Sequence, residues 1–102
     1  MAETIAQRVL RCVKPGGERT TVTLCIGSPY QASDVDWACP VRLEGLHSRL
    51  SDIHGVDSFQ ALMLARRFLL QLMTGVIEAG GSFRNLEDDS VVDVATLFES
   101  GA

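Results

Sequence analysis

The stretch VDSFQALMLARRFLLQLMTGVIEAGG, residues 56–81, decides the fold of this chain. Its apolar residues recur three and four positions apart, which is the spacing of one helical face, and the glycine pair at its end is a stop signal. The start is equally well marked, because Asp57 is a favoured N-cap residue and Gln60 completes a capping-box pattern three positions later. The sequence therefore predicts one long helix over residues 58–79, capped by Asp57 and Gln60.

The same letters raise a second hypothesis, that Ser58 accepts a phosphopantetheine arm. Gly55, Asp57 and Ser58 match the attachment site of carrier proteins. A carrier, however, is a bundle of helices with an acidic recognition face. Here the upstream residues carry strand and turn signals, and the helix displays Arg66 and Arg67. We therefore interpret this stretch as a helix cap and do not expect Ser58 to be modified.

Upstream of the helix, residues 1–56 are predicted to form an antiparallel meander. The run RTTVTLCIG, residues 19–27, alternates as a strand does and follows the turn sequence PGGE, so we expect a hairpin with residues 4–14. Residues 28–34 are expected to form a loop. The next run, DWACPVRLEGL, alternates again but contains Pro40, which has no N–H to donate and is expected at a sheet edge or a bulge.

The end of the chain carries weaker signals. A fourth strand is expected over roughly residues 46–54, before the helix. The tail, residues 82–102, is expected to be partly flexible, and its stretch SVVDVATLF suits a short strand or a short helix, of which we favour the strand. The whole chain, residues 1–102, is thus predicted to be a single α+β domain: an antiparallel β-meander of about four strands packed against one long helix, with a short tail element.

The composition argues against a nucleic-acid-binding protein and against a membrane-spanning one. Nine Lys and Arg residues stand against thirteen Asp and Glu, a net charge of −4 that argues against nucleic acid. No run reaches the roughly 18 apolar residues of a membrane span, and the start shows no secretory signal. Three cysteines without a Cys-x-x-Cys pair suit reduced thiols, so we expect a cytoplasmic protein.

Neither a cofactor nor a metal is expected. Cys39, His47 and His54 match no common zinc spacing, and Cys39 fits the buried face of its strand. Nucleophilic catalysis would need a side chain such as Cys25 beside a histidine and a carboxylate such as Asp52, and the spacing gives no sign that these converge. We therefore do not expect an enzyme.

The predicted helix has more apolar surface than one sheet covers, because only a narrow strip of it is polar. Two alternatives remain for what covers the rest of this apolar surface: a second copy of the chain, or the tail folded back over the helix. We expect a homodimer, with another protein partner also allowed. The helix residues expected at the dimer face are Met63, Leu64, Arg66, Phe68 and Leu70.

Four residues are expected to contact a ligand or partner: Tyr30, Trp37, His47 and His54. Tyr30 and Trp37 flank a loop, although Trp37 also fits a core anchor. The leading hypothesis is a non-enzymatic protein–protein interaction domain, an accessory or immunity-type binder. The alternative is a small-molecule-binding protein or an enzyme with a pocket between sheet and helix.

The paired motifs WACPVRLEGL and HGVDSFQALMLA resemble a family of small uncharacterised bacterial proteins, a domain of unknown function. The family carries a Trp-x-Cys-Pro strand motif and a Gly-Val-Asp-Ser-x-Gln-Ala-Leu helix start. The resemblance covers roughly residues 20–80, and the tail departs from it. It implies a bacterial origin and the fold described above, without an activity.

Overall fold

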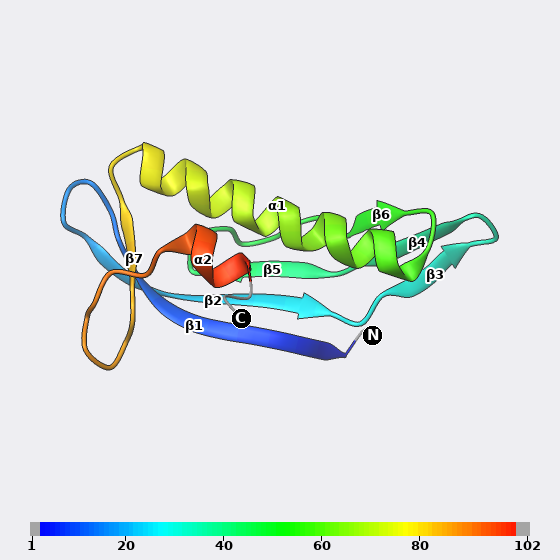
Figure 1. Ribbon diagram of the computed structural model, residues 1–102, viewed down its shortest axis with the longest axis horizontal. Helices are drawn as coiled ribbons and strands as arrows, with labels where there is room; N and C mark the ends of the chain where they lie inside the picture. The colour runs from blue at the N-terminus through cyan, green and yellow to red at the C-terminus, as the bar shows by residue number, and fades with distance from the viewer. Residues whose placement is uncertain (1–2, 100–102) are drawn as a thin grey trace.

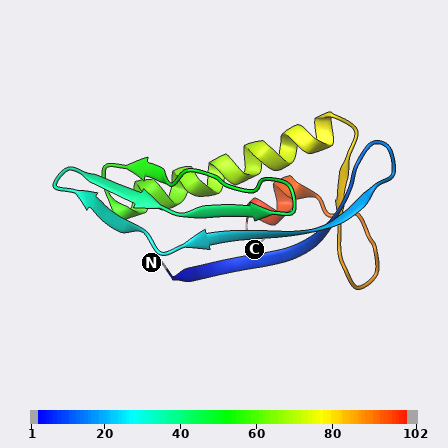
Figure 2. The same ribbon diagram turned by 180° about the vertical axis from the view of Figure 1, so that it is seen from behind.

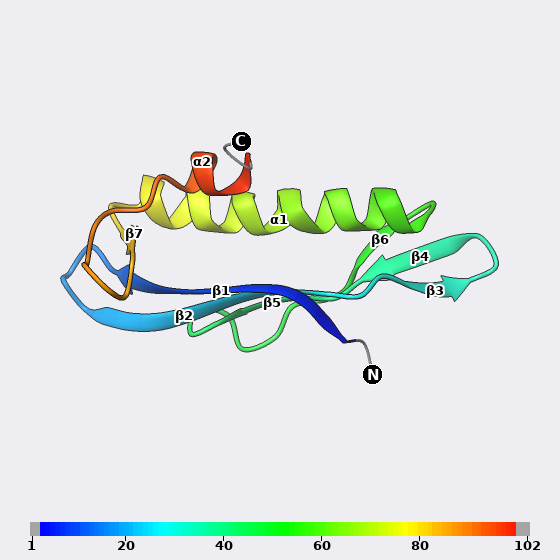
Figure 3. The same cartoon turned by 60° about the horizontal axis from the view of Figure 1, so that its bottom comes forward.

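The computed structural model describes residues 3–99. Its elements in chain order are β1 (Thr4–Val13), β2 (Arg19–Gly27), β3 (Tyr30–Ser33), β4 (Asp36–Cys39), β5 (Val41–Glu44), β6 (Ile53–Gly55), α1 (Ser58–Glu78), β7 (Ser82–Arg84) and α2 (Val94–Phe98). The strands form one layer, and both helices lie on the same face of it (Figures 1 and 3). The predicted α+β fold is confirmed.

Two antiparallel sheets make up the strand layer. The first has four strands in the order β5-β2-β1-β7, and the second has three in the order β3-β4-β6. The predicted hairpin is present: β1 and β2 pair from Val13 opposite Arg19 outward, and the Lys14 N–H donates to the Glu18 carbonyl at 2.8 Å across the turn. No described helix is long and apolar enough to cross a membrane.

Pro40 divides the expected third strand in two. β4 pairs with β3 and β6, whereas β5 pairs with β2 in the other sheet. Because Pro40 has no N–H, the ladder breaks there, and its carbonyl instead accepts from the Gly27 N–H at 2.8 Å. The predicted edge position holds for β5, which is an outer strand of its sheet.

Two further expectations upstream of the helix need correction. Residues 28–34 are not a loop throughout, since Tyr30–Ser33 form β3 and make a hairpin with β4. The expected strand at 46–54 is reduced to Ile53–Gly55, because the preceding residues form an excursion on the sheet face that neither helix covers (Figure 2). Short polar strands of this kind bury little apolar surface, so their alternation is faint in the sequence.

The predicted helix and its cap are confirmed in α1. The Asp57 Oδ1 atom accepts from the Gln60 N–H at 2.7 Å, and the Gln60 Oε1 atom accepts from the Val56 N–H at 2.7 Å. Val56, the residue before the cap, is 70 % exposed and adds little packing to the first turn of α1. Four residues on one line of α1 are fully buried against the strands: Ala61, Ala65, Leu69 and Met73.

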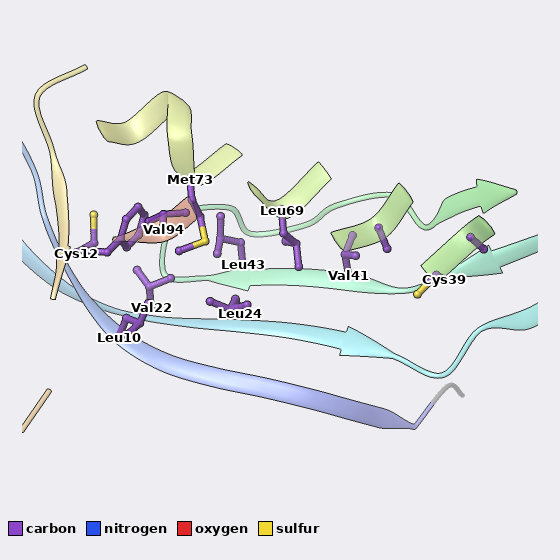
Figure 4. Packing of buried hydrophobic residues seen from close by; sticks show 13 residues of the cluster. Leu10, Cys12, Val22, Leu24, Cys39, Val41, Leu43, Leu69, Met73 and Val94 are labelled. Atoms are coloured by element: carbon purple, nitrogen blue, oxygen red, sulfur yellow. The ribbon is translucent and has the colours of Figure 1, made fainter. Parts of the chain in front are cut away.

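The core lies between α1 and the first sheet (Figure 4). Leu10, Val22 and Leu43 come from three adjacent strands, and all are 0 % exposed. Phe83 on β7 closes one end of this core, and Val94 at the start of α2 joins it. The tail is thus part of the core rather than an appendage.

The tail differs from the expected strand. Val91 makes an isolated bridge to Arg84, but the residues after it form helix α2. The cause is local, because Asp93 caps the helix: its Oδ1 atom accepts from the Ala95 N–H at 3.1 Å. The expected flexibility of the last residues, 100–102, lies outside the described part of the chain.

Replacing Asp57 by Ala should destabilise the protein by about 1 kcal/mol, because the first turn of α1 loses the side-chain acceptor of the Gln60 N–H. Urea unfolding followed by circular dichroism measures the change. Asp34→Ala is the matched control, since Asp34 lies exposed in the turn between β3 and β4. Equal stability of the two variants would contradict the cap.

Two glycines should respond in opposite directions to alanine. A Cβ atom at Gly55 would lie 2.6 Å from the Ala61 nitrogen, so Gly55→Ala should cost roughly 1–3 kcal/mol by forcing β6 and α1 apart. A Cβ atom at Gly75 meets nothing within 4 Å, and Gly75→Ala should stabilise α1 by about 0.5–1 kcal/mol. Thermal unfolding of the two variants provides the comparison.

Candidate functional site

One face of the three-stranded sheet brings predicted site residues together. Tyr30 pairs with Ala38, and Ala38 pairs with His54, so Tyr30 and His54 lie in one row across three strands. The neighbouring row contains Gly55, which touches α1 at Ala61. Because side chains alternate along a strand, the Tyr30–His54 row points away from α1.

Two polar pairs occupy this outer face. The Tyr30 hydroxyl donates to the Asp52 Oδ2 atom at 2.5 Å, and the His54 Nδ1 atom lies 2.5 Å from the Asp36 Oδ2 atom. The hydrogen bond to Asp52 raises the pKa of the Tyr30 hydroxyl, with smaller contributions from desolvation and from the charges of Asp52 and Asp36. With Nδ1 turned to Asp36, His54 is left with its Nε2 atom for a ligand.

An open hollow adjoins these pairs. Its volume is ≈ 570 Å³ where Tyr30, Asp52 and His54 line it with Arg49, and a neighbouring hollow of ≈ 900 Å³ extends from Tyr30 to Arg42. No residue of α1 lines either of them. These two hollows therefore lie on the face of the strands away from α1, whereas the sequence predicted a pocket between sheet and helix.

The other two predicted contact residues lie elsewhere. Trp37 occupies the row of Gly55, faces α1 and packs against the core, as expected for an anchor. His47 is exposed on the excursion after β5 and lines neither hollow. Asp36 and Arg49 were not predicted as site residues, and Asp52 was considered only as a possible catalytic carboxylate. The sequence did contain one signal for this cluster: Asp52 and His54 are two residues apart, which places them on the same face of a strand.

The cluster has limited chemical options. Within residues 3–99, no group of three or more His, Cys, Asp or Glu side chains is placed to hold a metal ion. Cys39 is fully buried and next to Ala38, so it faces α1, while His54 faces away. The His54 side chain is hydrogen-bonded to Asp36, and it lines the same hollow as Tyr30, Ser51 and Asp52.

The expected dimer face on α1 is partly covered within the chain. The Arg66 guanidinium donates to the Phe98 carbonyl of α2 through Nε at 3.1 Å, so the tail does fold back over the helix. Leu64, Phe68 and Leu70 are half-buried, and Met63 is 37 % exposed. At the start of the helix, Phe59 remains 71 % exposed beyond the reach of α2 (Figure 3).

A different apolar surface lies along β1. β7 pairs with β1 only from Arg11 to Val13, so on its outer side the segment from Thr4 to Leu10 has no partner among the described strands (Figure 1). We call this segment, residues 4–10, the free edge of β1. It carries two exposed apolar residues, Ile5 at 52 % and Val9 at 37 %.

An arginine cluster stands at one end of the free edge. The Arg19 guanidinium holds the Asp89 carboxylate through two bonds of 2.9 and 3.0 Å, and Arg11 and Arg84 approach the same carboxylate at 3.6 and 3.7 Å. Asp89 adopts a φ of 60°, which a non-glycine residue rarely does. Three guanidinium groups thus gather around the Asp89 carboxylate, and Glu87 and Asp88 precede it in the same turn.

The fold accounts for the position of Ser58 in the sequence. It is the first residue of α1, directly after the cap Asp57, and it follows β6 rather than another helix. The all-helical setting of a carrier protein is missing from the described part of the chain. The cap accounts for the Gly-Val-Asp-Ser sequence without a covalent arm.

Comparison with known proteins defines the class. A family model described as "Domain of unknown function (DUF6968)" matches residues 6–78, and the chain belongs to this family. That match includes the Trp-x-Cys-Pro and Gly-Val-Asp-Ser stretches on which the resemblance rested. No curated protein and no solved structure matches the chain.

Tyr30 is the single tyrosine, so its titration can be followed by tyrosinate absorbance. Its pKa should lie above the ordinary tyrosine value, because the bond to Asp52 requires the protonated hydroxyl. This bond stabilises the fold below the ordinary tyrosine pKa and is lost as the pH rises through the raised pKa. Asp52→Asn should lower the midpoint, and Asp34→Asn should leave it unchanged.

Proposed function

We propose that this chain is a protein–protein interaction domain that acts as a homodimer, without enzymatic activity of its own. The observation that carries the proposal is the free edge of β1. Its unsatisfied backbone donors and acceptors and its exposed Ile5 and Val9 form a template for another strand. Addition of a strand to such an edge is a common mode of protein recognition.

The shape of the chain supports this proposal. Its radius of gyration is 14.3 Å, against about 13 Å for a compact domain of this length, and its extents are 46 × 31 × 23 Å. A thin, elongated molecule buries less of its own surface. Because α2 already covers part of α1, the unpaired strand edge becomes a stronger candidate interface than the helix face expected from the sequence.

The biological setting is proposed on coarser grounds. The resemblance to small bacterial proteins supports an accessory or immunity-type binder of bacterial origin. Cys12, Cys25 and Cys39 are all free and buried, which suits a reducing compartment such as the cytoplasm.

The first experiment is the mass of the native protein by light scattering and native mass spectrometry over a range of concentrations. A concentration-dependent dimer is expected. Val9→Lys should raise its Kd roughly tenfold or more, since a lysine on a strand edge opposes pairing. Val35→Lys is the control, because Val35 is 81 % exposed in the β3–β4 turn. A monomer at all concentrations would refute the homodimer.

A second candidate function has one specific observation in its favour. Tyr30, Arg49, Asp52 and His54 meet at an open hollow, where they offer both donors and acceptors to a small polar ligand. Ligand screening by NMR tests it, with the ring signals of Tyr30 and His54 as reporters. Binding that is lost in Tyr30→Phe and His54→Ala, with the dimer unaffected, would support this function. Unmoved ring signals across a broad library of small polar compounds would dismiss it.

A further inference from the structure

We infer that the apolar groove between β1 and α2 binds a small carboxylic acid, with its carboxylate held by Arg8 and a compact apolar body about the size of a benzene ring. This inference goes beyond the proposed function and does not depend on it, because the groove is formed within a single chain. The groove has a volume of ≈ 150 Å³ and is lined by Ala6, Gln7, Arg8, Leu24, Ile26, Leu97 and Phe98.

The floor of the groove consists of two cross-strand pairs of the β1–β2 hairpin. Ala6 lies opposite Ile26, and Arg8 lies opposite Leu24, two positions further along the same strands. Because side chains two positions apart share a face, both pairs project to one side of the sheet. Leu24 is 8 % exposed and belongs to the core, so this is the side that the helices cover.

Helix α2 provides the wall of the groove through Leu97 and Phe98. It lies beside α1, on the side toward β1 (Figure 1). Both ends of α2 are fixed within the chain: Asp93 caps its first turn, and the Phe98 carbonyl accepts from the Arg66 Nε atom at 3.1 Å. The groove is therefore formed before a ligand arrives, as ligand sites usually are.

The apolar lining determines the body of the ligand. A cavity of about 150 Å³ lined by aliphatic and aromatic side chains is large enough for benzene. Such a surface holds water weakly, so a compact apolar group that displaces this water gains affinity. Ala6 helps to keep the space open, because its side chain is the smallest of those in the lining.

The charge of Arg8 determines the polar end of the ligand. Of the described residues that line the groove, Arg8 alone is charged. Its Nη2 atom makes one long hydrogen bond, 3.4 Å to the Asn85 Oδ1 atom, and within residues 3–99 it forms no ion pair, whereas the arginine cluster further along is bound to Asp89. A guanidinium in this position can hold a carboxylate through two parallel hydrogen bonds. Its single charge matches a carboxylate better than a phosphate ester, which carries about −1.5 to −2 at pH 7.

Benzoate is the probe, and two related compounds are its matched controls. Benzamide keeps the ring without the charge, and acetate keeps the charge without the ring. Titrations of the protein followed by methyl NMR use the signals of Leu24, Ile26 and Leu97 as reporters. Benzoate should shift these signals saturably with a Kd on the order of 1 mM, and both controls should bind at least about tenfold more weakly.

Two substitutions test the two ends of the ligand separately. Arg8→Gln should weaken benzoate binding about tenfold and leave benzamide binding unchanged, whereas Arg67→Gln, exposed on α1 and outside the groove, should change neither. Ala6→Ile should abolish the shifts that benzoate causes, because the larger side chain fills the groove. Ala6 is exposed on its strand, so this variant should fold, and its methyl spectrum without ligand checks that it does.

Saturable shifts at the groove that depend on both Arg8 and Ala6 would support the proposal. The absence of shifts at about 20 mM benzoate, well above the expected Kd, would overturn it. Equal binding of benzamide would also overturn it, since Arg8 would then make no contact with the acid. Shifts confined to the rings of Tyr30 and His54 would place the ligand at the hollow on the other face of the strands, against the proposal.

Discussion

The helix α1 packs against strands of both sheets, and most of the structure follows from how closely it can approach them. At the first turn of α1, Ala61 lies against the backbone of Gly55, where a side chain would not fit. Further along, Leu69 and Met73 reach the wider space above the four-stranded sheet. Small residues at one end and large ones at the other let a straight helix follow a strand layer that Pro40 has divided.

The parts of the fold that the sequence predicted are those with strong, local causes. The period of α1, its Asp57 cap and the β1–β2 hairpin each depend on residues close together in the chain. Pro40 was recognised as a ladder breaker, but the strand after it was not seen to join another sheet, since that depends on pairing with distant β2. The tail was misassigned because the valines before Asp93 favour a strand, while the capping side chain of Asp93 favours a helix.

The candidate site, too, could be predicted from the sequence only in part. Tyr30 and His54 were singled out and do lie together, because their strands align in register on either side of β4. Trp37 and His47 do not join them: one faces the helix, and the other sits on the excursion after β5. Their placement depends on which face of a short strand is buried, and only the packing of α1 decides that. The free edge of β1 was equally hidden, because it exists only where β7 stops.

The three buried cysteines can report the local opening of three different parts of the structure. Cys12 lies beside β7, Cys25 lies on β2, and Cys39 lies in the three-stranded sheet, and each is at most 3 % exposed. A thiol of this kind reacts with an alkylating reagent only when the structure around it opens. The three rates would therefore resolve the local stability of the tail end, the central hairpin and the small sheet separately, without any label added to the chain.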